Sequence, residues 1–145
     1  MSEPMTPDAI PQEIVAALIA VRERAYAPYS RHPVGALVIG ESGRRYAGAN
    51  VEVVHYKGIC AEASAIAALA SAGERQLREV WVIGPGRHLC TPCGDCRQRI
   101  REFATPETRI RVVDAEGRLL KEYDMEALLP DSFGPENLSH EALHD

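Results

Sequence analysis

Apolar and polar positions alternate along this chain in blocks, and each block predicts one helix or one strand. Apolar residues recur at helical spacing over Ile14–Ala27, and Pro11 suits the first turn of a helix at this point. The runs Val34–Ile39 and Arg45–Val51 flank a glycine-containing turn at Glu41–Arg44 and predict a β-hairpin. The chain therefore opens with a helix followed by two antiparallel strands.

Helices and strands continue to alternate in the second half. An Ala-rich helix is expected from about Ile59 to Gly73, where the glycine ends it. Val80–Ile83 is short and apolar and precedes Gly84-Pro85-Gly86, which is typical of a buried strand. The remaining elements are a helix within Cys93–Ala104 and strands at Thr108–Val113 and Leu119–Tyr123. This order predicts an α/β fold, a three-layer sandwich with a mixed central sheet.

Length and composition fit one globular domain. The chain has 145 residues, 46% of them apolar, and we expect residues 1–145 to form a single domain with flexible tails at 1–8 and 139–145. A formal net charge of -5 argues against binding to nucleic acid or to an anionic membrane. The longest apolar stretch is too short and too polar to span a bilayer, and the N-terminus lacks the features of a signal peptide. We therefore expect a cytoplasmic protein with a small-molecule partner.

Three of the four cysteines lie close together, in the segment Cys90–Cys96 (CTPCGDC). In a reducing compartment, clustered cysteines indicate metal or redox chemistry more often than disulfides. Cys93 and Cys96 are three positions apart at the start of a predicted helix, so both sulfurs can point to one spot. A helix start also favours thiolate, because its N–H groups are unpaired and carry partial positive charge. Cys93 and Cys96 are therefore candidate zinc ligands.

A third ligand and a carboxylate are expected from the preceding helix. Cys60 begins that helix, and parallel neighbouring helices that enter from one edge of a sheet would bring it to Cys93 and Cys96. Glu62 would then lie near the metal without binding it. Three protein ligands, an open position for water and an adjacent carboxylate are the layout of a catalytic zinc site. Such a site suits hydrolysis of an amidine-like C–NH2 bond, with Glu62 moving the proton.

These motifs resemble those of the zinc-dependent cytidine deaminase family, in its homotetrameric, free-nucleoside form. The family signature is His or Cys, one residue, Glu, and later Pro-Cys-x-x-Cys. This chain has Cys60-Ala61-Glu62 and Pro92–Cys96 at those places. Further matching segments, in family order, are Ala27–Ser30, Pro33–Ala36, Asn50–Glu52, Leu128–Pro130 and Phe133.

The resemblance implies an activity and a set of site residues. The activity is hydrolysis of cytidine or deoxycytidine to uridine or deoxyuridine, with release of ammonia. Glu62 would carry the proton, Asn50 and Glu52 would hold the ribose, and Phe133 would reach the base from a neighbouring subunit of a homotetramer. The implied residues are Cys60, Cys93 and Cys96 for Zn²⁺, Glu62 for catalysis, and Asn50, Glu52, Ala61, His32 and Phe133 for the nucleoside.

Departures from the family pattern fall on the substrate side. His32 stands where the family usually has an aromatic residue that stacks on the pyrimidine. The segment 50–60 is one residue shorter than usual, and Ala63 replaces a common Arg, which leaves Arg97 to soften the charge of three thiolates. These features are similar to those of blasticidin S deaminases, although Glu52 is not. A deaminase of a modified cytosine nucleoside is therefore an alternative.

Cys90 distinguishes the enzyme from a second alternative. We interpret Cys90 as a small buried apolar residue outside the metal site. If all four cysteines instead formed one structural zinc or redox knuckle, the protein would be a non-catalytic zinc-binding module. That alternative leaves Glu62 without a role and does not explain Asn50, Glu52 or Phe133.

Overall fold

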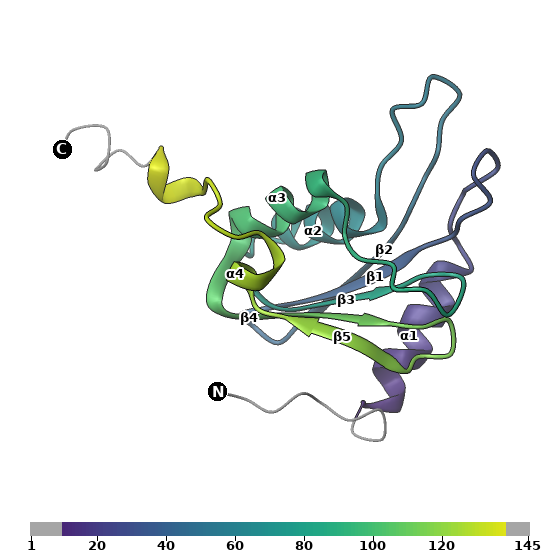
Figure 1. Cartoon of the computed structure of the whole chain (residues 1–145), viewed down its shortest axis with the longest axis horizontal. Helices are drawn as coiled ribbons and strands as arrows, with labels where there is room; N and C mark the ends of the chain where they lie inside the picture. Colours follow the sequence, from purple (N-terminus) through teal and green to yellow (C-terminus); the bar gives the residue numbers. More distant parts are fainter. Residues whose placement is uncertain (1–9, 139–145) are drawn as a thin grey trace.

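A five-stranded mixed sheet forms the centre of the fold, with strand order β2-β1-β3-β4-β5 (Figure 1). The computed structural model describes residues 10–138, so the tails expected at 1–8 and 139–145 lie outside the described residues. β3 and β4 run parallel, whereas the other neighbouring strands are antiparallel. The strands are β1 (Gly35–Gly40), β2 (Arg45–Ala49), β3 (Leu77–Ile83), β4 (Ala104–Val113) and β5 (Leu119–Tyr123).

Helices cover both faces of this sheet, which confirms the predicted three-layer α/β sandwich. Helix α1 packs on one face, and α2, α3 and the short α4 lie over the other (Figure 1). The helices are α1 (Gln12–Arg22), α2 (Ala61–Ser71), α3 (Gly94–Phe103) and α4 (Met125–Leu128), followed by a 3₁₀ helix at Pro135–Asn137.

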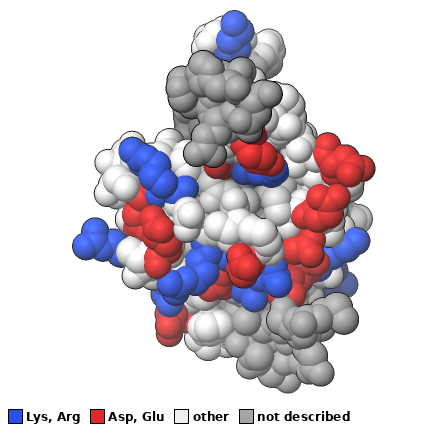
Figure 2. Space-filling model, turned by 90° about the vertical axis from the view of Figure 1, so that its left-hand side faces the viewer, with Lys and Arg blue, Asp and Glu red and all other residues white. Residues whose placement is uncertain are grey.

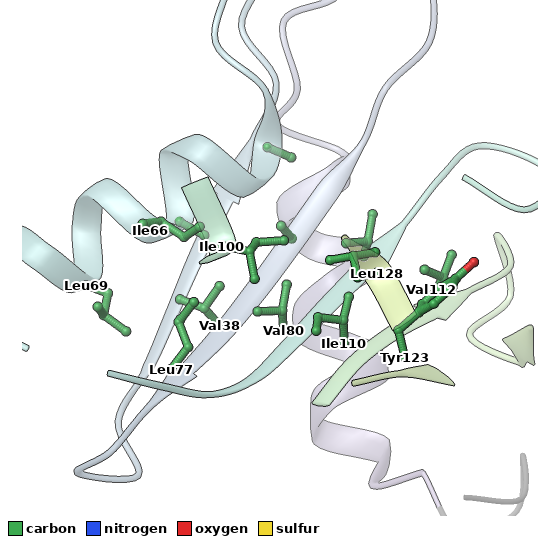
Figure 3. Close-up of a cluster of buried hydrophobic side chains, with 14 of the residues drawn as sticks. Val38, Ile66, Leu69, Leu77, Val80, Ile100, Ile110, Val112, Tyr123 and Leu128 are labelled. Atoms are coloured by element: carbon green, nitrogen blue, oxygen red, sulfur yellow. The ribbon is translucent and has the colours of Figure 1, made fainter. Parts of the chain in front are cut away.

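Both faces of β1 are buried, because successive side chains of a strand point to opposite layers. Val38 joins a cluster that includes Leu69 of α2 and Ile100 of α3 (Figure 3). Leu37 packs on the other face with Leu18 of α1. Burial of these apolar side chains fixes α2 and α3 on the sheet, and with them the first turn of each helix.

The predicted order of helices and strands through β5 is confirmed, and the differences lie at element ends and in α4, which was not predicted. The first helix stops at Arg22 rather than reaching Ala27, because Tyr26 forms a bridge with Val51. The amide of Tyr26 donates to the carbonyl of Asn50 at 2.9 Å. A partner distant in sequence therefore outweighs the local helical periodicity.

Two further differences concern the second half. β4 begins at Ala104 rather than at Thr108, and the Thr108 hydroxyl donates to the carbonyl of Leu77 at 2.6 Å. Helix α4 was not predicted, since one turn is too short to show a period. It begins at a side-chain cap, in which the amide of Ala127 donates to Asp124 at 2.8 Å.

Charged side chains of both signs are mixed on the surface, as Figure 2 shows for one face. Exposed pairs such as Arg99 and Asp95, 3.1 Å apart, contribute little stability in water. Within residues 10–138, no helix has both the length and the apolar character needed to cross a bilayer.

Candidate active site

Two helix N-termini meet at one edge of the sheet. β2 and β3 run in the same direction, because both are antiparallel to β1. Helix α2 follows β2 and helix α3 follows β3, so both helices start at the same edge. Cys60 is the N-cap residue of α2 and Cys93 is the N-cap residue of α3. The sheet topology therefore brings the two cysteine motifs together, as the sequence predicted.

The thiols of Cys60, Cys93 and Cys96 converge at this edge. Their sulfur atoms all lie within 4.8 Å of one another, and the Cys60 and Cys93 sulfurs are 3.8 Å apart. Zn–S bonds of about 2.3 Å at tetrahedral angles separate two sulfurs by roughly 3.8 Å. The donor set thus fits Zn²⁺, the predicted cofactor, and among residues 10–138 it is the one such group of His, Cys, Asp and Glu side chains.

Burial favours the protonated form of two of these thiols, Cys96 and Cys60. It raises the pKa of Cys96 far above its usual range, and the nearby Glu62 carboxylate raises it further. Burial also raises the pKa of Cys60. At Cys60 and Cys96, desolvation therefore outweighs the expected stabilisation of thiolate by the helix starts. Zinc binding would displace these protons, which makes zinc affinity dependent on pH.

Glu62 lies in the first turn of α2 and is 5% exposed. Burial raises its pKa above the usual range of a glutamate, because a low dielectric disfavours the charged form. A carboxyl group with a raised pKa gives up and takes back a proton more readily near neutral pH. Its placement suits the predicted proton transfer.

A cavity of about 430 Å³ opens beside these groups. It brings together most of the residues that the sequence singled out, whereas Cys96 is fully buried and does not line it. The lining residues are Ser30, His32, Val34, Asn50, Glu52, Cys60, Ala61, Glu62, Cys90, Thr91 and Cys93.

Asn50 and Glu52 both bind the loop formed by residues 29–34. Asn50 accepts a hydrogen bond from the amide of Val34 and donates one to the carbonyl of His32, each at 2.9 Å. Glu52 accepts from the amides of Tyr29 and Ser30, each at 3.0 Å, and from the Ser30 hydroxyl. This anchoring role was not predicted, because the sequence does not show which loop lies against the two side chains.

The hydrogen bonds to Glu52 also set its charge. The Ser30 hydroxyl, followed by the Ser30 amide, holds the pKa of Glu52 below its usual range. Glu52 is therefore ionised at neutral pH.

Cys90 belongs to the cavity wall rather than to the group of three thiols. Its sulfur lies 3.6 Å from Nε2 of His32, and the side chain is half-buried. Among the described residues, Cys90 is not part of the group of three converging thiols, and its place outside the metal site stays a prediction. Its description as a small apolar residue was incomplete, since it contacts a polar ring in the cavity.

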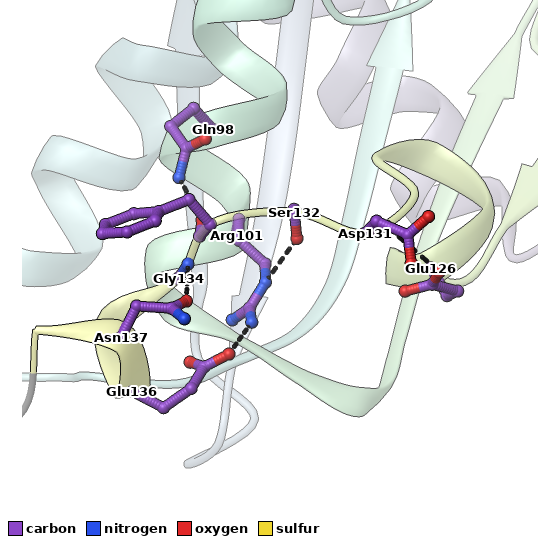
Figure 4. Close-up of polar contacts among 9 residues, drawn as sticks. Gln98, Arg101, Glu126, Asp131, Ser132, Gly134, Glu136 and Asn137 are labelled. Atoms are coloured by element: carbon purple, nitrogen blue, oxygen red, sulfur yellow. Dashed lines mark hydrogen bonds and ion pairs between the residues drawn. The ribbon is translucent and has the colours of Figure 1, made fainter. Parts of the chain in front are cut away.

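Phe133 does not line the cavity of its own chain, and its side chain is 57% exposed. Its backbone is nevertheless anchored to α3, because Gln98 donates to the Phe133 carbonyl at 2.8 Å. Arg101, also on α3, donates to the Ser132 hydroxyl at 2.8 Å and pairs with Glu136 (Figure 4). The role of Phe133 in a neighbouring subunit stays a prediction.

Arg97 supports the site through the backbone. Its guanidinium donates to the carbonyl of Pro92 at 2.8 Å and to that of Leu128 at 2.7 Å. The first of these bonds fixes the chain immediately before Cys93. Arg97 thus holds the loop that carries a metal ligand, which the sequence did not predict.

Comparison with known proteins places the chain among deaminases. Residues 9–112 match the family model described as "Cytidine and deoxycytidylate deaminase zinc-binding region". A cytidine deaminase of Sporosarcina psychrophila is 35% identical over 132 residues, which cover 90% of this chain and 96% of that protein. A cytidine deaminase of Mycobacterium tuberculosis H37Rv is 37% identical over 118 residues, covering 81% of this chain and 84% of that protein.

Solved structures agree with these sequence relatives. The crystal structure of cytidine deaminase from Burkholderia pseudomallei superposes with a TM-score of 0.78 at 33% identity, covering 86% of this chain and 99% of the other. The Mycobacterium tuberculosis cytidine deaminase structure gives a TM-score of 0.73 at 31% identity, covering 86% of this chain and 98% of the other. The fold is therefore shared with proteins of one named activity.

Proposed function

This chain belongs to the cytidine and deoxycytidylate deaminase family, and we propose that it hydrolyses cytidine or deoxycytidine to uridine or deoxyuridine with release of ammonia. It is a zinc-dependent aminohydrolase. The two alternatives, a blasticidin S type deaminase and a non-catalytic zinc-binding module, are not favoured by relatives that are named cytidine deaminases.

The observation that carries the proposal is the buried carboxyl group of Glu62 beside three converging thiols. Glu62 lines the same cavity as Cys60 and Cys93, at the starts of two helices fixed on the sheet. A buried carboxyl group is costly, so its place beside a metal-ligand set supports a role in catalysis.

We assign the chemical steps to this chain's own residues as follows. Zinc held by Cys60, Cys93 and Cys96 would supply Lewis acidity toward a water molecule. Glu62 accepts a proton from the water as its oxygen attacks C4 of the cytosine ring, and passes that proton to N3, whose double bond to C4 opens. Glu62 then takes the remaining proton from the C4 hydroxyl and delivers it to the exocyclic nitrogen, so that the C4–N bond breaks, ammonia leaves and a C4 carbonyl remains. The cavity walls would orient the ring so that its C4 atom lies within reach of these groups.

Asn50 and Glu52 retain hydrogen-bonding capacity for a ribose hydroxyl. The amide nitrogen of Asn50 has a second N–H besides the one bonded to the His32 carbonyl. Glu52 is ionised and lines the cavity next to Asn50, and a carboxylate has about four acceptor positions. The loop bonds of both side chains pre-organise them, which supports selection of a nucleoside over the free base.

The base end of the cavity is assigned to Ala61 and His32. Ala61 is fully buried at the first position of α2, where an amide has no partner inside the helix. That backbone amide can donate a hydrogen bond to an acceptor atom on the edge of the pyrimidine. His32 provides a polar ring on the cavity wall in place of a hydrocarbon ring.

The charge of the cavity favours a nucleoside over a nucleotide. Among the described residues that line it, Glu52 and Glu62 are acidic and none is Lys or Arg. A phosphate group at the sugar end would approach the ionised Glu52 without a compensating cation. Cytidine monophosphate should therefore be a poor substrate.

We also propose the assembly and setting of the enzyme. Exposed apolar side chains on the segments around the cavity, together with the anchored and exposed Phe133, support a homotetramer in which Phe133 completes a neighbouring site. The large exposed apolar side chains of these segments are Tyr26, Tyr29, Val51, Val54, Tyr56 and Ile59. The proposed setting is pyrimidine salvage in the cytoplasm, by a chain that forms a single deaminase domain.

A substrate series tests the proposal. Purified enzyme with measured zinc content is assayed for ammonia release from cytidine, deoxycytidine, cytosine and cytidine monophosphate. We expect kcat/KM for the two nucleosides to exceed those for cytosine and the monophosphate by more than about a hundredfold. Preference for free cytosine would contradict the sugar roles of Asn50 and Glu52, and preference for the monophosphate would contradict the charge argument.

A further inference from the structure

Cys90 is a cavity residue that neither the zinc site nor the proton transfer uses. Its side chain lines the cavity together with Glu62 and His32 and is half-buried. The thiol lies 3.6 Å from Nε2 of His32, which is hydrogen-bonding range for the large sulfur atom. His32 and Cys90 come from loops that are distant in sequence, so this contact joins two walls of the cavity.

The scaffold holds Cys90 firmly. Gly84, immediately after β3, approaches it so closely that a Cβ on Gly84 would lie 2.7 Å from the Cβ of Cys90. The carbonyl of Gly84 accepts a hydrogen bond from Arg22 of α1 at 2.8 Å. Cys90 therefore rests against the end of a central strand, which is itself tied to a helix on the opposite face of the sheet.

The loop that carries His32 is held mainly through its backbone. The His32 amide donates to the Ser30 hydroxyl at 3.1 Å, and the His32 carbonyl accepts from Asn50 at 2.9 Å. Glu52 in turn holds Ser30. These bonds place the Cα of His32 but leave rotation about its side-chain bonds free. The hydrogen bond recorded for the imidazole itself is the one with Cys90.

We propose that Cys90 is a positioning residue for substrate binding, whose thiol holds the imidazole of His32 in one orientation as a wall of the nucleoside cavity. The inference rests on the proposed function for its substrate and on the geometry above for the contact. An imidazole has two different nitrogens, and rotation of the ring exchanges the edge that faces the cavity. A thiol on the rigid side of the cavity selects one of the two arrangements.

We take the thiol as the donor of this hydrogen bond. Burial, with a smaller contribution from the Glu62 charge, raises the pKa of Cys90, which favours the protonated sulfur. A neutral thiol can donate to Nε2, and the ring proton of His32 would then be on Nδ1.

A double-mutant cycle tests the role in binding. In Cys90→Ala we expect KM for cytidine to rise about three- to fivefold with kcat within about twofold, because a weak hydrogen bond is lost. Cys90→Ser supplies another donor and should recover part of the loss. In a His32→Ala background, Cys90→Ala should have no further effect on KM. Leu89→Ala, at an exposed neighbour in the same loop, measures the effect of altering the loop alone.

An equal loss on Cys90→Ala in the presence and absence of the His32 ring would overturn the proposal, since Cys90 would then act by another route. A KM for Cys90→Ala equal to that of wild type would also overturn it. Zinc content is measured for each variant, so that a change in metal loading is not mistaken for a change in binding.

A second readout does not depend on turnover. The ¹⁵N NMR signals of the His32 ring, assigned by their loss in His32→Ala, report which nitrogen carries the proton. Wild type should show a proton on Nδ1 and an acceptor at Nε2, whereas Cys90→Ala should show mixed tautomers. Identical signals in the two proteins would refute the contact. If the NMR signals show the contact but cytidine is not deaminated, the proposed function is refuted while the contact between Cys90 and His32 is still supported.

Discussion

Gly48 of β2 sets how closely α2 approaches the sheet, and its replacement by alanine should disturb the metal site from a distance. A Cβ at position 48 would lie 2.5 Å from the amide nitrogen of Ala65, 2.7 Å from the carbonyl oxygen of Ala61 and 2.7 Å from Cβ of Ser64. Two of these atoms belong to the backbone of α2, so they cannot rotate away. Ordinary contact begins at 3.4 Å, which requires the helix to move outward by roughly 0.7 to 0.9 Å.

The expected cost has two parts. Overpacking of this kind typically costs about 1–3 kcal/mol of folding stability, or a Tm lower by roughly 3–10 °C for a chain of this size. The same shift moves Cys60 and Glu62, which open α2, relative to Cys93 on α3. A misplacement of about 1 Å can lower kcat/KM by up to about a hundredfold. Gly48→Ala should therefore lose activity while it still folds.

The assay compares Gly48→Ala with Gly86→Ala, a matched control. A Cβ at Gly86 meets nothing within 4 Å, and Gly86 is not among the glycines with positive φ. Thermal unfolding followed by circular dichroism gives Tm, elemental analysis gives zinc per chain, and ammonia release gives kcat/KM. If Gly48→Ala and Gly86→Ala are equal in all three measurements, the reasoning about the helix position is refuted.

Three further predictions concern the thiols, the C-terminal segment and Glu52. In zinc-loaded protein, maleimide should leave Cys93 unlabelled, whereas chelation should make this exposed thiol reactive; a label on Cys93 in loaded protein would contradict its role as a ligand. Arg101→Gln should increase hydrogen exchange at residues 132–137, because the bonds to Ser132 and Glu136 are weakened. Unchanged exchange there would show that other contacts hold Phe133. Ser30→Ala should raise the pKa of Glu52, whose charged form persists above that pKa and is lost as pH falls through it. The acid limb of kcat/KM should then move to higher pH, and superimposable pH profiles would contradict this.

The order of elements and the convergence of three thiols were predictable because most of their signals are local. Helical periodicity marked α1 and α2, and the spacing of Cys93 and Cys96 placed two sulfurs on one helix turn. Cys60 followed from topology, since helices that enter a sheet from one edge start near each other. These inferences needed only short segments and a general rule of α/β folds.

The remaining features depend on contacts between distant segments. The first helix ends early because Tyr26 pairs with residues near Asn50, and no local pattern shows this. The contact of Cys90 with His32 joins two loops, each of which has an irregular backbone. The loop-binding role of Glu52 likewise depends on where Ser30 lies. Pairing across long sequence separations has no period to detect, so the sequence alone did not predict it.

The central claim is that Glu62 carries the proton in zinc-dependent deamination of a cytosine nucleoside. The most direct measurement is ammonia release from cytidine by wild type and Glu62→Gln at equal zinc content. Glutamine keeps the size of the side chain but cannot accept and return a proton. We predict one zinc per chain in both proteins and a rate lower by about two to four orders of magnitude in Glu62→Gln. Near-normal turnover by the zinc-loaded variant would contradict it.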